Sequence, residues 1–185
     1  MSTPGQLTSA IALSLTDPMN TMGYNVFSDH DPASGQVGKI VSHISEKNQQ
    51  GVQLSQLDMA IVDKKSGRAV VLIEIEETND RPKTLLGDIF GVLIGERITF
   101  HKKELKVGKW TTLLILGFRK AKHEKKNELL EGRHAERILT IINKVEKVKP
   151  LMETGNSKIG KVMIKTFAGK DELEGLIRSV VENAR

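Results

Sequence analysis

The sequence predicts an α/β protein in which helices flank a mixed central sheet. Short runs rich in valine and isoleucine alternate along the chain with segments whose apolar residues recur at helical spacing. Residues 110–118 form a nearly continuous apolar run, which is typical of a central strand buried on both faces. The 185 residues contain no internal repeat and no linker, so we expect one domain spanning residues 1–185.

The first part of the chain predicts a helix over residues 6–22 and a short strand over residues 25–28. Residues 37–47 are ambiguous, although their apolar side chains fall at helical spacing. Two strands are then expected over residues 57–62 and 70–76, because both segments are rich in aliphatic residues and a Lys-Lys-Ser-Gly turn separates them.

A helix is expected next, with Asn79 or Asp80 as its cap, Pro82 in its first turn and an end near Ile98. Glycines recur at every fourth position of this segment: Gly87, Gly91 and Gly95. Each costs about 1 kcal/mol relative to alanine inside a helix. The stripe therefore predicts a close backbone approach to the sheet, to a partner helix or to a second subunit.

The remaining elements are the buried strand over residues 110–118, an amphipathic helix over residues 134–148, a strand over residues 162–167 and a closing helix over residues 171–181. The chain has no cysteine and no run of 18 apolar residues, so we expect neither disulfides nor a membrane partner. A cytoplasmic protein is the simplest expectation.

Three acidic side chains interrupt the two apolar strands: Asp58 in the first, Glu74 and Glu76 in the second. Side chains alternate along a strand, so Glu74 and Glu76 point to the same face. A carboxylate in an apolar strand is costly to bury unless it is paired or binds a metal. Three such groups favour a hard divalent cation, Mg²⁺ or alternatively Mn²⁺. The competing interpretation, which the nearby Glu77 and Asp80 favour, is a set of solvated strand ends.

Asp58 followed by Glu74-Ile75-Glu76 resembles the signature of the PD-(D/E)xK nuclease superfamily, in which an acidic residue on one strand precedes Asp/Glu-x-Lys on the next. The resemblance covers residues 57–118 and implies a restriction-endonuclease-like core. It also implies that Asp58 and Glu74 bind the metal, with the Ile75 carbonyl as a further ligand. Glu76 stands where the family usually has lysine, although some of its restriction enzymes have glutamate at this position. The resemblance implies that Glu76 would bind metal or activate the attacking water.

A basic residue from the following helix sometimes replaces the missing lysine in this family, and Lys83 is the candidate here. The equal alternative is that Lys83 is an ordinary exposed lysine without a role in the site. Positive charge also gathers around and after the acidic strands, because residues 64–127 carry 15 basic and 8 acidic residues. We expect the densest part to contact DNA phosphates, rather than to form only a solvated loop, through five side chains: Arg119, Lys120, Lys122, Lys125 and Lys126.

Two other motifs carry less weight. Residues 155–162 have a spacing similar to a phosphate-binding P-loop, but Val162 stands where that motif needs serine or threonine, so we expect no nucleotide cofactor. The five histidines lack zinc-site spacing, and Asp29-His30-Asp31 is more typical of a polar turn than of a ligand cluster.

Together these features predict a Mg²⁺-dependent endodeoxyribonuclease acting on double-stranded or branched DNA, with a type II restriction endonuclease as the first interpretation. A DNA repair nuclease or a Holliday-junction-resolving nuclease is the close alternative. The missing motif lysine favours a third interpretation, a non-catalytic DNA-binding protein with the same fold. Cutting both strands of a duplex favours a homodimer, for which the glycine-striped helix offers one interface.

Overall fold

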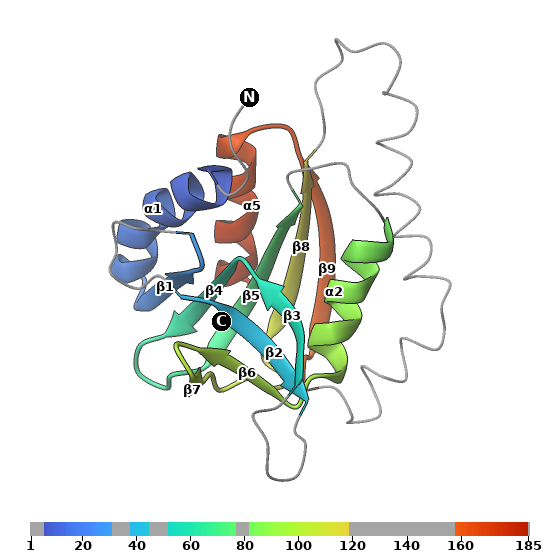
Figure 1. Ribbon diagram of the computed structural model, residues 1–185. Helices are drawn as coiled ribbons and strands as arrows, with labels where there is room; N and C mark the ends of the chain where they lie inside the picture. The colour runs from blue at the N-terminus through green and yellow to red at the C-terminus, as the bar shows by residue number, and fades with distance from the viewer. Residues whose placement is uncertain (1–5, 31–37, 45–51, 77–81, 119–157, 185) are drawn as a thin grey trace, which may run out of the picture.

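The structure is a computed structural model that describes residues 6–30, 38–44, 52–76, 82–118 and 158–184. Within these ranges the chain forms three helices and two sheets (Figure 1). The larger sheet has the strand order β1-β4-β5-β8-β9, and the smaller has the order β3-β2-β6-β7. No described helix has the length and apolar character needed to cross a membrane.

The central sheet is mixed, as the sequence predicts. Neighbouring pairs among β1, β4 and β5 are antiparallel, whereas β5, β8 and β9 run parallel to one another. Its strands are β1 (Tyr24–Ser28), β4 (Met59–Asp63), β5 (Ala69–Glu76), β8 (Thr112–Phe118) and β9 (Lys161–Phe167). A turn fixes the β4–β5 hairpin, because Oδ1 of Asp63 accepts hydrogen bonds from the backbone N–H (2.7 Å) and the hydroxyl (2.6 Å) of Ser66. Gly67 completes this turn at a φ of 67°, a conformation that favours glycine.

The smaller sheet is wholly antiparallel. Its strands are β2 (Ile40–Ile44), β3 (Val52–Leu57), β6 (Arg97–Phe100) and β7 (Lys103–Glu104). The helical spacing within residues 37–47 is therefore not realised in the described part of that segment. β2 pairs with β3 on one side and β6 on the other, and this pairing satisfies its backbone polar groups.

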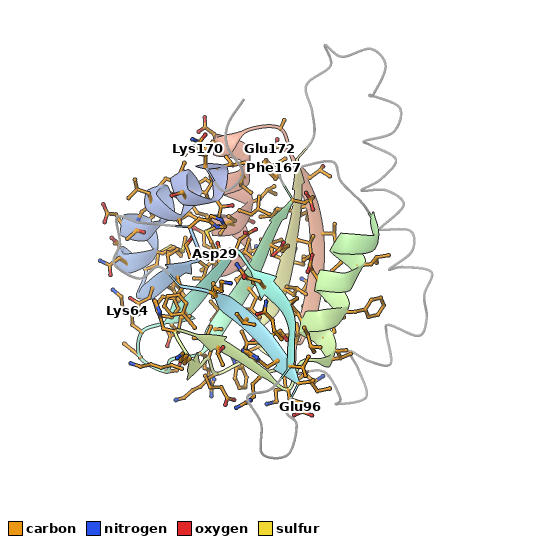
Figure 2. The ribbon with its side chains drawn as sticks, viewed as in Figure 1. Asp29, Lys64, Glu96, Phe167, Lys170 and Glu172 are labelled. Carbon is orange, nitrogen blue, oxygen red and sulfur yellow. The ribbon has the colours of Figure 1, made fainter. Side chains whose placement is uncertain are left out.

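Two helices, α1 (Gln6–Thr21) and α5 (Lys170–Glu182), cover one face of the central sheet, and their buried residues follow helical spacing. The other face packs against α2 (Pro82–Ile94) and the smaller sheet (Figures 1 and 2). Each face of the central sheet has its own hydrophobic core, one beneath α1 and α5 and one beneath α2 and the smaller sheet. Successive side chains of β4, β5 and β8 point alternately into these two cores. The α2 face of the sheet contains Ala60, Leu72, Leu113 and Ile115.

The predicted helix that includes α2 ends earlier than expected, at Ile94 rather than near Ile98. Gly95 lies so close to β2 that an added Cβ would overlap Oγ of Ser42. Gly91 similarly faces the backbone of Leu54 on β3, at 3.1 Å from an added Cβ. Two of the three striped glycines thus pack against the smaller sheet of the same chain, which is the first of the close approaches that the stripe predicts. The use of this helix as a subunit interface stays a prediction.

The other predicted elements that fall within the described residues agree with the structure to within a few residues, with one exception near the first acid. The segment expected as one strand over residues 57–62 is split, since β3 ends at Leu57 and β4 begins at Met59. The helix predicted over residues 134–148 lies outside the described residues.

Candidate metal centre

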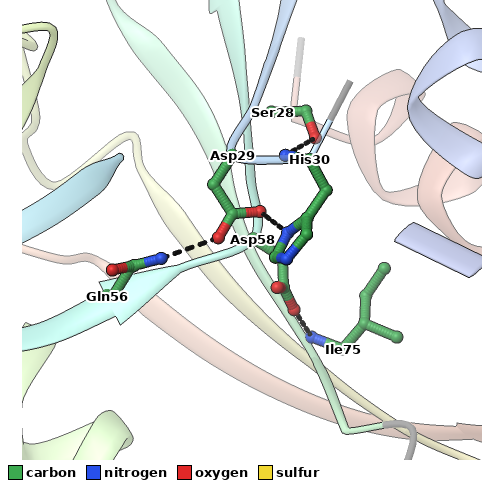
Figure 3. Close-up of polar contacts among 6 residues, drawn as sticks. All are labelled: Ser28, Asp29, His30, Gln56, Asp58 and Ile75. Atoms are coloured by element: carbon green, nitrogen blue, oxygen red, sulfur yellow. Dashed lines mark hydrogen bonds and ion pairs between the residues drawn. The ribbon is translucent and has the colours of Figure 1, made fainter. Parts of the chain in front are cut away.

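Asp58 is the single residue between a strand of the smaller sheet and a strand of the central sheet. Its backbone is held on both sides: its N–H donates to the Ile73 carbonyl at 3.1 Å, and its carbonyl accepts from the N–H of Asp29 at 3.0 Å. Oδ2 of Asp58 accepts a hydrogen bond from the Ile75 N–H at 2.6 Å (Figure 3). The carboxylate is therefore fastened at the side of β5.

The strand register brings Asp58 next to Glu74. Met59 pairs with Ile73, so the residue before Met59 stands across from the residue after Ile73. Glu74 has the same phase as Leu72, which faces α2, and Glu76 follows on that face two residues further along β5. Asp58 lies outside both strands, and among the neighbouring charges it has the largest effect on Glu74, so the two predicted ligands lie close together.

Glu74 has the most perturbed electrostatics in the described structure. Burial, followed by repulsion from other carboxylates, raises the pKa of Glu74 to about 10. The repelling groups, in order of effect, are Asp58, Asp88, Asp29 and Glu76. Oε2 of Glu74 is buried and has no hydrogen-bond partner among the described residues. Without a cation this carboxyl group is therefore protonated at neutral pH.

Two of the repelling residues were not among the predicted ligands. Asp88 lies on α2, and burial, then repulsion from Glu76, raises its pKa above the usual range. Asp29 directly follows β1, its side chain is only 4% exposed, and its Oδ2 accepts a 2.8 Å hydrogen bond from Nε2 of Gln56. The acidic centre, defined here as Asp29, Asp58, Glu74, Glu76 and Asp88, thus draws on β1, β5, α2 and the junction between the sheets.

A sequence signal for both residues exists. Asp88 stands four residues before Val92, which is buried against the sheet, so it interrupts the apolar stripe of α2. Asp29 has the same phase as Phe27, which packs on the α2 side of the sheet. In each case a carboxylate occupies a position that periodicity assigns to the interior.

His30 joins the edge of this centre. Its Nδ1 contacts Oδ1 of Asp29, and its backbone N–H donates to Oγ of Ser28 at 3.2 Å (Figure 3). Asp29, His30 and Asp58 each offer a possible ligand atom, and these atoms lie within 4.8 Å of one another. Asp29 and His30 thus lie beside the predicted first acid, whereas Asp31 lies outside the described residues, so the choice between a polar turn and a ligand cluster stays a prediction.

The structure describes the other predicted site residues unequally. The Ile75 N–H points towards Asp58, and in a strand the N–H and carbonyl of one residue face the same neighbour, so its carbonyl also points to that side. Lys83 belongs to the first turn of α2, but its side chain lies outside the described part of the chain. The five basic residues within 119–126 lie wholly outside it.

Searches against known protein families, curated proteins and solved structures find no match to this chain.

Proposed function

We propose that this protein is a metal-dependent endodeoxyribonuclease that hydrolyses phosphodiester bonds of DNA. One observation carries the proposal: the buried Oε2 of Glu74 has no hydrogen-bond partner among the described residues, although four other carboxylates lie near enough to raise the pKa of that side chain. Burying an ionised carboxylate without a partner is strongly unfavourable. A divalent cation would supply the missing partner and offset the repulsion.

The donor set fits Mg²⁺, with Mn²⁺ as the alternative. Every member of the acidic centre offers carboxylate oxygen, and Mg²⁺ prefers a few such oxygens together with water and substrate phosphate. Asp58 and Glu74 would hold the ion, and the Ile75 carbonyl faces the same side. When bound, such an ion supplies charge stabilisation at the phosphate and lowers the pKa of a coordinated water.

The surrounding residues have distinct roles in this proposal. The Ile75 N–H keeps the Asp58 carboxylate in one orientation, so little reorganisation is needed when substrate arrives. Glu76, on the same face and partly exposed, accepts the proton of the attacking water. Lys83, in the first turn of α2, donates to the phosphate oxygens.

DNA is the proposed substrate because the formal net charge is +5 while the site itself is acidic, an arrangement that suits a polyanion anchored away from the reacting phosphate. With the strands of the smaller sheet left aside, the elements follow one another along the chain as α1, β1, β4, β5, α2 and β8. This order also supports the proposal of a restriction-endonuclease-like core. Within this class a type II restriction endonuclease is the first choice, and a repair or junction-resolving nuclease is the second.

The proposal is tested by incubating pure protein with supercoiled plasmid, linear duplex and a four-way junction, each with Mg²⁺, Mn²⁺ or EDTA. We expect cleavage that depends on the metal and is lost in Glu74→Gln. The exposed Glu182 on α5 provides the matched control, and Glu182→Gln should cleave normally.

Discrete plasmid fragments would assign a restriction role, and preferential cutting of the junction would assign a resolving role. Cleavage that persists in EDTA or in Glu74→Gln would reject the metal centre. Binding of DNA without cleavage under any metal condition would reject the nuclease proposal in favour of a non-catalytic DNA-binding protein.

A further inference from the structure

A second site lies at the other end of β5 from the acidic centre. Arg68 immediately precedes β5, whereas Glu76 is its last residue, so about 26 Å of strand separates them at roughly 3.3 Å per residue. A pocket of about 430 Å³ opens there between the β4–β5 turn, the segment before β8 and the approach to β9. The lining residues that matter here are Ser66, Arg68, Glu104, Lys106, Trp110 and Lys158.

Arg68 is held in a defined position by an aromatic ring. Its guanidinium carbon lies 4.4 Å from the centroid of the Trp110 ring, a cation–π contact. Within the described part of the chain, no carboxylate or other acceptor engages this guanidinium. A planar fork fixed by stacking suits an oxyanion with several acceptor oxygens.

The wall that carries Trp110 is firmly connected to β5. Thr111 Oγ1 donates to the Ala69 carbonyl at 2.8 Å and accepts from the Gly108 N–H at 3.0 Å. The indole lies so close to Gly108 that an added Cβ would overlap the ring. With Arg68 over the ring and Gly108 beside it, we expect the indole to position Arg68 rather than to stack on a base.

Two lysines add to the positive charge. Lys106 Nζ donates to the Ser66 carbonyl at 3.1 Å, which brings the ammonium group to the pocket wall, and Lys158 is exposed at the rim. Among the described lining residues Glu104 is the single acidic one. The pocket therefore presents three positive charges against one negative charge.

We propose that this pocket binds a phosphate group through Arg68, Lys106 and Lys158. Phosphate matches the planar guanidinium fork and the two additional ammonium groups better than a singly charged carboxylate does. The group could belong to the DNA backbone or to a small phosphate compound, because both present the same oxygens. The proposal does not depend on nuclease activity, since a phosphate anchor serves a DNA-binding protein equally.

Recognition here differs from that of a P-loop. A P-loop surrounds phosphate with backbone N–H groups and needs a serine or threonine for Mg²⁺, whereas Val162 occupies that position in this chain. Lys158, from the segment with similar spacing, instead contributes its side chain to a pocket formed by three separate parts of the chain.

Trp110 is the chain's single tryptophan, so its fluorescence reports directly on this pocket. We would titrate the protein in EDTA with pyrophosphate, with AMP and with a 20-base-pair duplex, keeping ionic strength constant with NaCl. We expect a saturable change in emission for at least one ligand. Arg68→Gln should raise its Kd roughly ten- to hundredfold, because a charge-assisted hydrogen bond is removed.

Two further variants separate binding from misfolding and from bulk charge. Glu104→Gln removes the one acidic side chain among the described lining residues and should lower the Kd about twofold to fivefold, an improvement that a damaged fold would not produce. Lys170→Gln removes one positive charge at the start of α5 and should leave the Kd unchanged. Lys170 lies away from Lys64, which marks the β4–β5 turn beside the pocket (Figure 2).

Saturation by pyrophosphate or AMP with competition by the duplex would show that both sources share the site, and saturation by the duplex alone would identify the DNA backbone as the source. The proposal is overturned if no phosphate ligand gives a saturable change beyond that of NaCl. It is equally overturned if Arg68→Gln binds as tightly as the natural sequence. Because these titrations measure phosphate binding and not cleavage, neither result bears on the nuclease proposal.

Discussion

The backbone N–H of Ile75 donates a 2.6 Å hydrogen bond to Oδ2 of Asp58, so the first acid of the site is fastened to the strand that carries the second and third. Asp58 also stands where the chain passes from the smaller sheet into the central sheet. One carboxylate thus has a structural role at the junction and a proposed role as a metal ligand, and suitable substitutions separate the two.

Asp58→Asn and Asp58→Ala both remove the charge, but only asparagine retains an oxygen that can accept from Ile75. We expect Asp58→Ala to be less stable than Asp58→Asn by about 1–3 kcal/mol, the cost of leaving a buried donor unsatisfied. Thermal denaturation in EDTA measures this difference, and calorimetric titration with Mg²⁺ should show weakened binding in both variants. Equal stability of the two would mean that the Ile75 hydrogen bond contributes nothing to the fold.

The raised pKa of Glu74 predicts an unusual dependence of stability on pH. The pKa of Glu74 is about 10 in the folded protein, whereas the ordinary value of 4.5 applies to the unfolded chain. Between these two pH values the folded state therefore binds more protons than the unfolded state. The metal-free protein should therefore be most stable below about pH 4.5 with respect to this group, and should lose that contribution as pH rises towards 10.

Glu74→Gln should remove this dependence and raise the Tm at pH 8, by roughly 2–4 °C for each 1 kcal/mol of burial and repulsion that is relieved in a domain of this size. Mg²⁺ should raise the Tm of the natural sequence at pH 8 but not that of the variant. Denaturation scans from pH 5 to 9, with EDTA or Mg²⁺, make the comparison. The same pH slope in both proteins would contradict the assigned environment of Glu74.

The local sequence pattern was sufficient to predict most strands of the central sheet, because their apolar runs and turn residues are distinct. β8 is a continuous apolar run, and β5 is an aliphatic strand after a turn that Asp63 and Gly67 stabilise. β2 was not predictable in this way. Its apolar residues fit a helix equally well, and what makes it a strand is pairing with β6, more than 50 residues further along the chain.

The site shows the same division. The juxtaposition of Asp58 and Glu74 was predictable because each interrupts one of two neighbouring apolar segments, and the register of β4 and β5 continues to place Asp58 across from Glu74. Their role as metal ligands stays a prediction. Asp29 and Asp88 belong to elements whose positions depend on how α2 and β1 pack on the sheet. Sequence alone contains only the weaker signal of an acid at an apolar position.

The glycines of α2 offer a paired test of packing. An added Cβ at Gly87 meets no atom of the described residues within 4 Å, so Gly87→Ala should stabilise the protein by about 1 kcal/mol through helix propensity. At Gly91 the same Cβ would lie 3.0 Å from Cβ of Ser55 and 3.1 Å from the Leu54 carbonyl, so Gly91→Ala should destabilise by about 1–3 kcal/mol. Denaturant unfolding of both variants checks the opposite signs, and a stabilising Gly91→Ala would contradict the close approach of α2 to β3.

The basic segment predicts a change in salt dependence. The variant neutralises four lysines of the segment within residues 119–126, namely Lys120, Lys122, Lys125 and Lys126. It should bind every DNA sequence more weakly, and the slope of log K against log salt should fall by about 0.9 for each DNA phosphate that is no longer neutralised. A control removes the same charge from exposed positions elsewhere: Lys64, Lys65, Lys165 and Lys170. Binding isotherms from 50 to 300 mM salt compare them, and an unchanged slope in the first variant would show that this segment does not contact DNA.

Glu76→Lys is the sharpest test of the chemistry, because it restores the residue that the PD-(D/E)xK signature usually has. Glu76 now repels both Glu74 and Asp88. A lysine there should replace repulsion with attraction and raise the Tm of the metal-free protein. If Glu76 accepts the proton of the attacking water, cleavage should nevertheless fall by about 10²-fold or more while duplex binding is retained.

Glu76→Gln is the companion variant, since it removes the proton acceptor without adding positive charge. We expect it to lose cleavage as fully as Glu76→Lys. If lysine retains activity where glutamine does not, position 76 acts by stabilising charge at the phosphate, and the proton acceptor must be another group. His30 would then be the first residue to replace, because it is exposed and contacts Asp29 within the same centre.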